Sequence, residues 1–138
     1  MSRIVLDTNV LVAGLRSRRG AANRLLRLVG RSSFEIALSV PLVLEYEDVL
    51  LRPDMVPFST MEVRAFIDVL CQEGNPQRVY FLWRPYLPDP KDDMVLELAV
   101  AASCDAIVTY NLRDFRGVDR FGIRAVRPEA FLKAPPPF

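Results

Sequence analysis

Short runs of apolar residues alternate along this chain with longer segments in which apolar residues recur every three or four positions. The short runs are typical of strands buried in a sheet, and the longer segments are typical of helices with one apolar face. Five strands are predicted, over residues 3–6, 34–38, 78–82, 106–109 and 123–126. Helices are predicted over residues 9–15, 21–29, 40–51, 60–73, 92–103 and 129–132.

Capping residues support several of these boundaries. Ser59 followed by Glu62 is a capping-box pattern, and Ser39 before Pro41 supplies an N-cap and a first-turn proline. The predicted helix that starts at residue 92 is apolar over residues 94–103 apart from Glu97, which predicts that it is buried on nearly all sides.

The alternation of strands and helices predicts one three-layer α/β domain, with a mainly parallel central sheet of four to five strands flanked by helices. The domain is expected to span residues 1–132, and residues 133–138 are expected to form a disordered, proline-rich C-terminal tail. In such sheets, functional residues gather at the carboxyl ends of the strands, near the point where the strand order reverses.

The composition removes several kinds of chemistry. The chain has 138 residues, of which 51% are hydrophobic, and it contains no His. This length is enough for a core without disulfide or metal staples. The absence of His excludes Ser-His-Asp and Cys-His nucleophilic catalysis and His-rich zinc sites. Catalysis would therefore rest on carboxylates, with a hard metal ion held by oxygen ligands.

The cellular location follows from the cysteines and the apolar runs. Cys71 and Cys104 are too few for a disulfide scaffold and do not form a Cys-x-x-Cys pair. The apolar run directly before Asp7 has only three residues, which is too few for a signal peptide, and no run approaches the roughly 20 residues that span a bilayer. The sequence predicts a cytoplasmic protein without a membrane segment.

Positive charge is concentrated near the N-terminus. The net charge is only +1, but residues 1–31 contain seven arginines and a single acid. Arg16, Arg18 and Arg19 are therefore candidates for contacts with RNA phosphates. The alternative is that these arginines lie on the solvated face of a helix and pair with acids elsewhere. The sequence leaves both interpretations open.

Acidic residues stand where an α/β fold would bring them together, each at a strand end or on the helix that follows. They are Asp7, Glu45 or Glu47, Asp92 or Asp93, and Asp114. Carboxylates a few ångströms apart raise one another's pKa, and a bound divalent cation relieves the repulsion. Mg²⁺ or Mn²⁺ held in this way can also bind a substrate phosphate and activate water.

Each acid also has a purely structural interpretation. Asp7 and Asp92 are both natural N-caps, and Asp93 would then lie in a first helical turn, where the helix dipole favours it. Asp114 could initiate a turn, and Glu45 lies on a helix with several acids that must mostly face solvent. Spacing alone makes the cluster plausible without making it specific.

Several segments, taken together and in order, resemble the PIN domain. They are Asp-Thr-Asn-Val-Leu at 7–11, Ser39 with Glu45, Asp-Pro-Lys-Asp-Asp at 89–93 with Leu-Glu-Leu-Ala at 96–99, Ile-Val-Thr-Tyr-Asn-Leu-Arg-Asp-Phe at 107–115 and Pro-Glu-Ala-Phe-Leu at 128–132. The resemblance covers residues 1 to about 132 and is closest to small stand-alone bacterial and archaeal PIN proteins, the VapC-like toxins of toxin–antitoxin pairs. It implies a ribonuclease whose acidic cluster binds Mg²⁺ or Mn²⁺ and directs water at a phosphodiester, with a cognate antitoxin as a possible partner.

The resemblance assigns roles to individual residues. The first acid is Asp7, the second is Glu45 and the third is one of the pair Asp92 and Asp93. Where many members of the family have Asp, this chain has Asn111, and Asp114 three residues later is expected to supply the missing carboxylate.

Neighbouring polar residues are candidates for supporting roles. Thr8, Asn9, Thr109 and Asn111 could orient the carboxylates or bind phosphate. Capping and turn formation explain Thr8, Asn9 and Thr109 equally well.

Two other classes of function compete with the ribonuclease. Phosphatases with an aspartyl nucleophile resemble Asp-x-Asp after the first strand, and receiver domains place a Lys after a late strand; neither feature is present. The non-enzymatic alternative is a degenerate PIN-like module that binds RNA or a protein partner without hydrolysis, and Asn111 is the residue that keeps it open.

A homodimer is also expected, since the chain has more apolar side chains than its own core readily hides. The predicted contact surface comes from two helices and consists of Leu25, Leu26, Val29, Val63, Phe66, Ile67 and Leu70.

Overall fold

The fold is built on one parallel sheet. A computed structural model describes residues 2–79 and 86–133, and its five strands lie in the order β3-β2-β1-β4-β5, with every neighbouring pair parallel. The strands are β1 (Ser2–Leu6), β2 (Phe34–Leu38), β3 (Asn75–Pro76), β4 (Ala106–Val108) and β5 (Arg124–Val126). The chain moves outward from β1 through β2 to β3, then returns to the other side of β1 for β4 and β5. The strand order therefore reverses beside β1.

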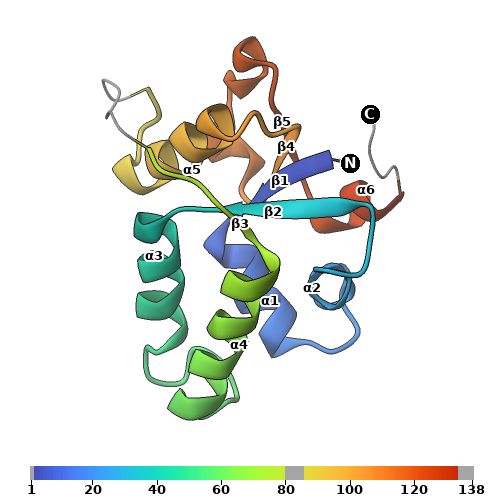
Figure 1. Cartoon of the computed structure of the whole chain (residues 1–138), viewed down its shortest axis with the longest axis vertical. Helices are drawn as coiled ribbons and strands as arrows, with labels where there is room; N and C mark the ends of the chain where they lie inside the picture. Colours follow the sequence, from blue (N-terminus) through green and yellow to red (C-terminus); the bar gives the residue numbers. More distant parts are fainter. Residues whose placement is uncertain (1, 80–85, 134–138) are drawn as a thin grey trace.

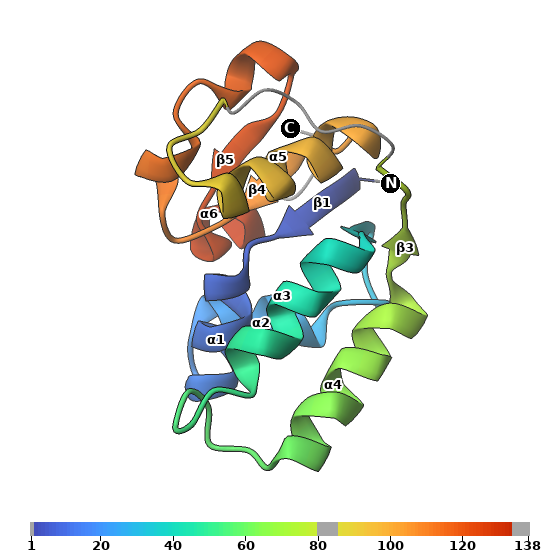
Figure 2. The same cartoon turned by 90° about the vertical axis from the view of Figure 1, so that its left-hand side faces the viewer.

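Helices cover both faces of this sheet. Figures 1 and 2 show α1, α2, α3 and α4 on one side and α5 on the other, so the predicted three-layer α/β architecture is confirmed. The helices are α1 (Thr8–Arg16), α2 (Ala21–Arg27), α3 (Val40–Leu50), α4 (Thr60–Glu73), α5 (Pro90–Ala101) and α6 (Pro128–Lys133), with 3-10 turns η1 (Leu112–Phe115) and η2 (Val118–Phe121). Among the helices in the described part of the chain, none is long and apolar enough to cross a membrane.

The two central strands and α5 form the middle of the core. Residues 4–6 of β1 and all of β4 are at most 1% exposed, as expected for continuous apolar runs between two helical layers. Leu96, Leu98 and Ala99 of α5 are fully buried, and Glu97 is 8% exposed. The predicted burial of this helix is confirmed, and the burial fixes α5 against the sheet that carries the candidate site.

Capping explains where the helices that matter for the site begin. The Ser59 capping box opens α4 as predicted, and Ser39 Oγ accepts a hydrogen bond from the Leu42 amide at the start of α3. The N-cap of α5 is Asp89, however, and not Asp92: Asp89 accepts from the Lys91 amide at 2.9 Å, and Pro90 occupies the first turn. Asp92 and Asp93 therefore both lie in the first turn of α5.

The predicted third strand lies elsewhere in the sequence. β3 is formed by Asn75–Pro76, directly after α4, and the Gln77 amide continues the pairing by donating to the Leu38 carbonyl at 2.7 Å. Residues 78 and 79 are not in a strand, and the rest of the predicted strand lies outside the described residues. The helix-stopping sequence Gly-Asn-Pro thus starts the edge strand as well.

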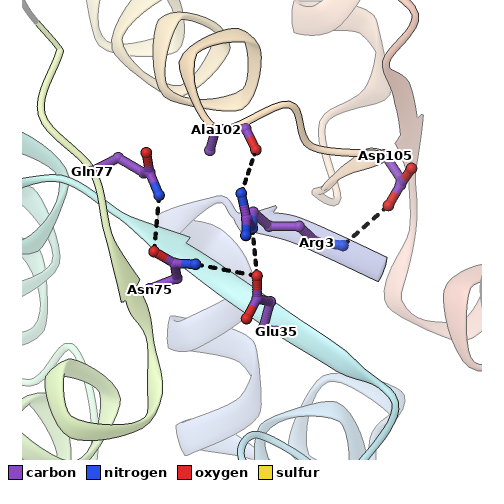
Figure 3. Close-up of polar contacts among 6 residues, drawn as sticks. All are labelled: Arg3, Glu35, Asn75, Gln77, Ala102 and Asp105. Carbon is purple, nitrogen blue, oxygen red and sulfur yellow. Dashed lines mark hydrogen bonds and ion pairs between the residues drawn. The ribbon is translucent and has the colours of Figure 1, made fainter. Parts of the chain in front are cut away.

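A polar network braces the sheet at the end opposite Asp7. The Arg3 guanidinium of β1 donates to the Glu35 carboxylate of β2 at 2.5 Å and to the Ala102 carbonyl after α5 at 2.8 Å (Figure 3). The Arg3 backbone amide donates to the Asp105 carboxylate. Asn75 of β3 donates to the same Glu35 oxygen. The hydrogen bonds from Arg3 and then Asn75 lower the pKa of Glu35. The network ties three strands and the end of α5 together.

The surface predicted for a homodimer is largely part of this chain's own core. Leu25, Val63, Ile67 and Leu70 are each at most 5% exposed. Leu26, Val29 and Phe66 pack against the same core. The predicted interface is therefore wrong, because the apolar faces of α2 and α4 are used to cover the sheet and the adjacent helices.

Candidate active site

The site begins at Asp7, directly after the central strand β1. The Asp7 amide donates to the Val108 carbonyl of β4 at 2.9 Å, which brings the ends of the two strands together where the strand order reverses. One Asp7 carboxylate oxygen accepts from the Thr8 amide at 2.9 Å, and the other accepts from the Thr109 hydroxyl at 2.8 Å. Asp7 is thus the N-cap of α1 and also presents a carboxylate at the switch point.

Asn9 and Thr109 hold this arrangement in place. Asn9 Nδ2 lies 3.2 Å from an Asp7 oxygen and 3.3 Å from Thr109 Oγ1, and Asn9 Oδ1 accepts from the Tyr110 amide. The Asn111 amide donates to Thr109 Oγ1 at 3.0 Å. Because Thr109 is completely buried, these bonds hold the start of α1 and the segment after β4 in place relative to the Asp7 carboxylate.

The second acid arrives on α3. Buried Tyr46 donates to the Leu6 carbonyl at the end of β1, at 2.5 Å, and so anchors α3 against that strand. The preceding residue, Glu45, faces the space beside Asp7, with 18% of its side chain exposed. Glu47 is not among the residues that face this space.

Four of the predicted acids line one cavity of about 200 Å³. Each comes from a different segment: Asp7 after β1, Glu45 on α3, Asp92 on α5 and Asp114 on η1. The complete lining is Asp7, Thr8, Asn9, Leu42, Glu45, Asp89, Lys91, Asp92, Met94, Val95, Asn111 and Asp114. Asn111, predicted to replace a family Asp, and Asp114, predicted to compensate for it, both face the cavity.

The structure separates Asp92 from Asp93. Asp92 faces the cavity, whereas Asp93 is 8% exposed and accepts hydrogen bonds from the Leu87 amide at 2.9 Å and the Tyr86 amide at 3.2 Å. The Asp93 carboxylate is therefore occupied in holding the segment before α5.

The surroundings of Asp7 and Asp92 disfavour their ionised forms. Burial raises the pKa of Asp7, the nearby Asp114 and Glu45 charges raise it further, and hydrogen bonds from Thr109 and Thr8 oppose the rise. Burial, followed by the charges of Asp7 and other nearby carboxylates, raises the pKa of Asp92 to about 7. These are the shifts expected of buried carboxylates that lie near other negative charges.

Two charged residues of the lining, Asp89 and Lys91, are absent from the set predicted above. Asp89 was overlooked because Asp92 was considered as the cap, although an acid directly before Pro90 is a stronger N-cap signal. Nothing in the sequence pattern singles out Lys91. Its Nζ lies 3.8 Å from the Glu45 carboxylate, so it brings the positive charge found in the lining.

The arginines predicted to bind RNA lie away from the cavity. Arg16, Arg18 and Arg19 are exposed, and Arg16 lines a separate hollow with residues 54–57. Arg16 ends α1 and Asp7 caps its start, so at 1.5 Å per residue the helix separates them by roughly 14 Å. The cavity and these arginines are at opposite ends of α1.

The donor set suits a hard divalent cation, since carboxylate oxygens from four segments face one cavity. Within residues 2–79 and 86–133, no three acidic or Cys side chains stand close enough together to hold a metal ion as they lie. Asp7 is engaged with Thr109, and Glu45 is close to Lys91. By chemistry the residues fit Mg²⁺ or Mn²⁺, and the Lys91 ammonium is the charge beside Glu45 that such a cation would join or replace.

Comparisons with known proteins support the resemblance seen in the sequence. The profile of one family, described as PIN domain, matches residues 3–113. Two similar solved structures are VapBC2 from Rickettsia felis bound to a promoter DNA fragment and VapBC-1 from nontypeable Haemophilus influenzae. Their TM-scores are both 0.63, at 13% and 15% identity, covering 89% and 92% of this chain and 98% of each of theirs. A comparison with curated proteins finds no match.

Proposed function

The chain belongs to the PIN domain family, and from this premise we propose that it is a Mg²⁺- or Mn²⁺-dependent ribonuclease that acts as the toxin of a toxin–antitoxin pair. The observation that carries the proposal is the meeting of Asp7, Glu45, Asp92 and Asp114 in one cavity at the sheet's switch point. No nucleophilic constellation built on His competes for this role, since the chain has no His.

The four carboxylates would hold the cation. When bound, a divalent cation neutralises charge on the phosphate and lowers the pKa of water. Asp7 is kept in one orientation by Thr109 and Thr8, so the site is preorganised before substrate arrives. Lys91, whose Nζ lies 3.8 Å from the Glu45 carboxylate, would contact a non-bridging phosphate oxygen. Hydrolysis then joins a water oxygen to phosphorus, breaks the opposite P–O bond and transfers a proton to the leaving oxygen.

The direct test is cleavage of a single-stranded RNA by the purified protein, with gel separation of the products. We expect cleavage in Mg²⁺ or Mn²⁺ and none after chelation. Cleavage that persists in excess chelator would contradict the proposed mechanism.

Asn111 supports one alternative, a degenerate module that binds RNA without hydrolysing it. Asn111 faces the cavity at the position where the resemblance to the PIN family implies Asp, and an amide supplies an oxygen ligand without its charge. RNA binding by the wild type without cleavage in either metal would favour this alternative.

The third acid provides a prediction with a matched control. We expect Asp92→Asn to slow RNA cleavage at least about 10-fold, because Asp92 faces the cavity. Asp93→Asn should keep most of the activity, since an amide oxygen can still accept from the Leu87 and Tyr86 amides. Initial cleavage rates of the two variants decide between these carboxylates, and the opposite ranking would reverse the assignment.

Association with a second copy and with an antitoxin protein belongs to the same proposal. Both similar solved structures named above are VapBC structures, which supports the antitoxin partner.

Support for a homodimer comes from α3 and α4, where Val40, Leu44, Met61 and Val69 are each more than half exposed. We expect light scattering at micromolar concentration to give the mass of two chains. A single-chain mass across the range would contradict the dimer.

A further inference from the structure

A second cavity, of about 510 Å³, lies directly beside the acidic one. Asp114 lines both cavities, so the two spaces share a wall. The lining of the second cavity is Tyr86, Leu87, Pro88, Arg113, Asp114 and Arg116. It therefore combines an aromatic ring with two guanidinium groups next to the place where a phosphodiester would be cut.

The Tyr86 ring is held in position from several sides. Its hydroxyl lies 3.4 Å from the Gly117 carbonyl, and its ring meets Phe121 edge-on at 5.3 Å between centroids. The Arg120 guanidinium lies 5.7 Å from the ring centroid, and the Tyr86 amide donates to buried Asp93. Tyr86 nonetheless stays 36% exposed. The ring is a preorganised, accessible aromatic surface.

Gly117 is needed for this placement. Its φ of +87° lies in the left-handed region that favours glycine, and a Cβ there would come within 2.7 Å of the Tyr86 hydroxyl. A side chain at 117 would therefore strain the backbone and press on the Tyr86 hydroxyl.

The two arginines are available for a ligand. Arg113 and Arg116 flank Asp114 in sequence and are both exposed. Among the residues that the structure describes, neither has a carboxylate within ion-pair distance. Guanidinium groups of this kind bind phosphate oxygens in a bidentate manner.

From this cavity we propose a subsite for single-stranded RNA beside the cleavage site, in which an unpaired base stacks on Tyr86 and Arg113 and Arg116 contact the adjoining phosphates. Stacking on a protein ring requires an unpaired base, which favours a single strand over a duplex. The choice of RNA as the ligand rests on the proposed function. The subsite also gives buried Asp93 a role, since its carboxylate positions the Tyr86 backbone.

The test is fluorescence anisotropy with a short fluorescein-labelled single-stranded RNA, in EDTA so that binding is measured without hydrolysis. Tyr86→Ala should weaken binding about 5- to 100-fold, and Tyr86→Phe should restore most of it, because a phenyl ring still stacks. The double variant Arg113→Ala/Arg116→Ala should reduce the slope of log Kd against log salt by about 0.7 for each lost phosphate contact.

The matched control is Arg27→Ala/Arg64→Ala, which removes the same charge at two exposed arginines on α2 and α4 that line neither cavity, and it should leave that slope unchanged. The subsite is overturned if Tyr86→Ala binds like the wild type, if the control lowers the slope as much as the Arg113/Arg116 pair, or if the wild type does not bind the RNA. Binding that depends on Tyr86 in a protein that never cleaves RNA would instead contradict the proposed function and leave the subsite standing.

Discussion

Asp7→Asn is expected to slow RNA cleavage by about 100-fold or more, while the metal-free protein melts at a higher temperature than the wild type. The substitution removes a charge that faces Glu45 and Asp114 but keeps an oxygen that can accept from the Thr8 amide at the start of α1. Initial rates on single-stranded RNA and thermal melting in EDTA measure the two effects.

The pH dependence of the melting difference gives its physical origin. Because folding raises the pKa of Asp7 above its ordinary 3.8, the native state holds this proton more tightly than the unfolded chain does. The destabilising charge therefore develops as the pH rises above 3.8, and the gain from Asp7→Asn should be present at neutral pH and vanish in acid.

The control for Asp7→Asn is Asp68→Asn, on the exposed side of α4, which should change neither rate nor melting. A variant at Asp7 that cleaves RNA at the wild-type rate would remove Asp7 from the site. A large drop in metal-free melting temperature would show that the contacts with Thr109 and Asn9 outweigh the relief of repulsion.

Glu45→Gln is expected to lose cleavage to a similar extent, whereas Glu47→Gln should stay within about two-fold of the wild type. Glu45 faces the cavity, and Glu47, two residues further along α3, points about 200° around the helix axis from it. The same RNA assay compares both variants. Full activity in Glu45→Gln together with loss in Glu47→Gln would show that Glu47, and not Glu45, is the second acid of the site.

Much of the site follows from local pattern. An apolar strand that ends in Asp7, and a serine cap that starts the helix carrying Glu45, are enough to place two acids at the edge of a parallel sheet. Asp114 follows for the same reason, since it comes just after β4. The parallel sheet itself was predictable because strand and helix periodicities alternate along the chain.

The choice between Asp92 and Asp93 could not be predicted from the sequence. Both stand in the first turn of α5, and what separates them is a contact to the Tyr86 and Leu87 amides that depends on the path of the preceding loop. Asp89 and Asp92 are both acceptable N-caps for α5 by residue type. The position of Pro90 makes Asp89 the N-cap.

Contacts between segments far apart in the sequence could not be predicted from local pattern. Periodicity shows that α2 and α4 each have an apolar face, but it does not show whether that face packs against the same chain or a second one. Ile67 was therefore predicted in a dimer interface, whereas it is buried in this chain's own core. Likewise, a count of arginines does not show that Arg16 and Asp7 lie at opposite ends of α1, or that Arg113 and Arg116 line a second cavity that Asp114 shares.

The central claim is that the carboxylates around Asp7 bind the divalent cation on which RNA hydrolysis depends. The most direct measurement follows, in the same samples, the fraction of Mn²⁺ bound by electron paramagnetic resonance and the initial rate of RNA cleavage as Mn²⁺ is added. We expect the two curves to rise together in the wild type and both to collapse in Asp7→Asn. Cleavage at full rate without bound Mn²⁺, or unchanged Mn²⁺ binding in Asp7→Asn, would contradict the claim.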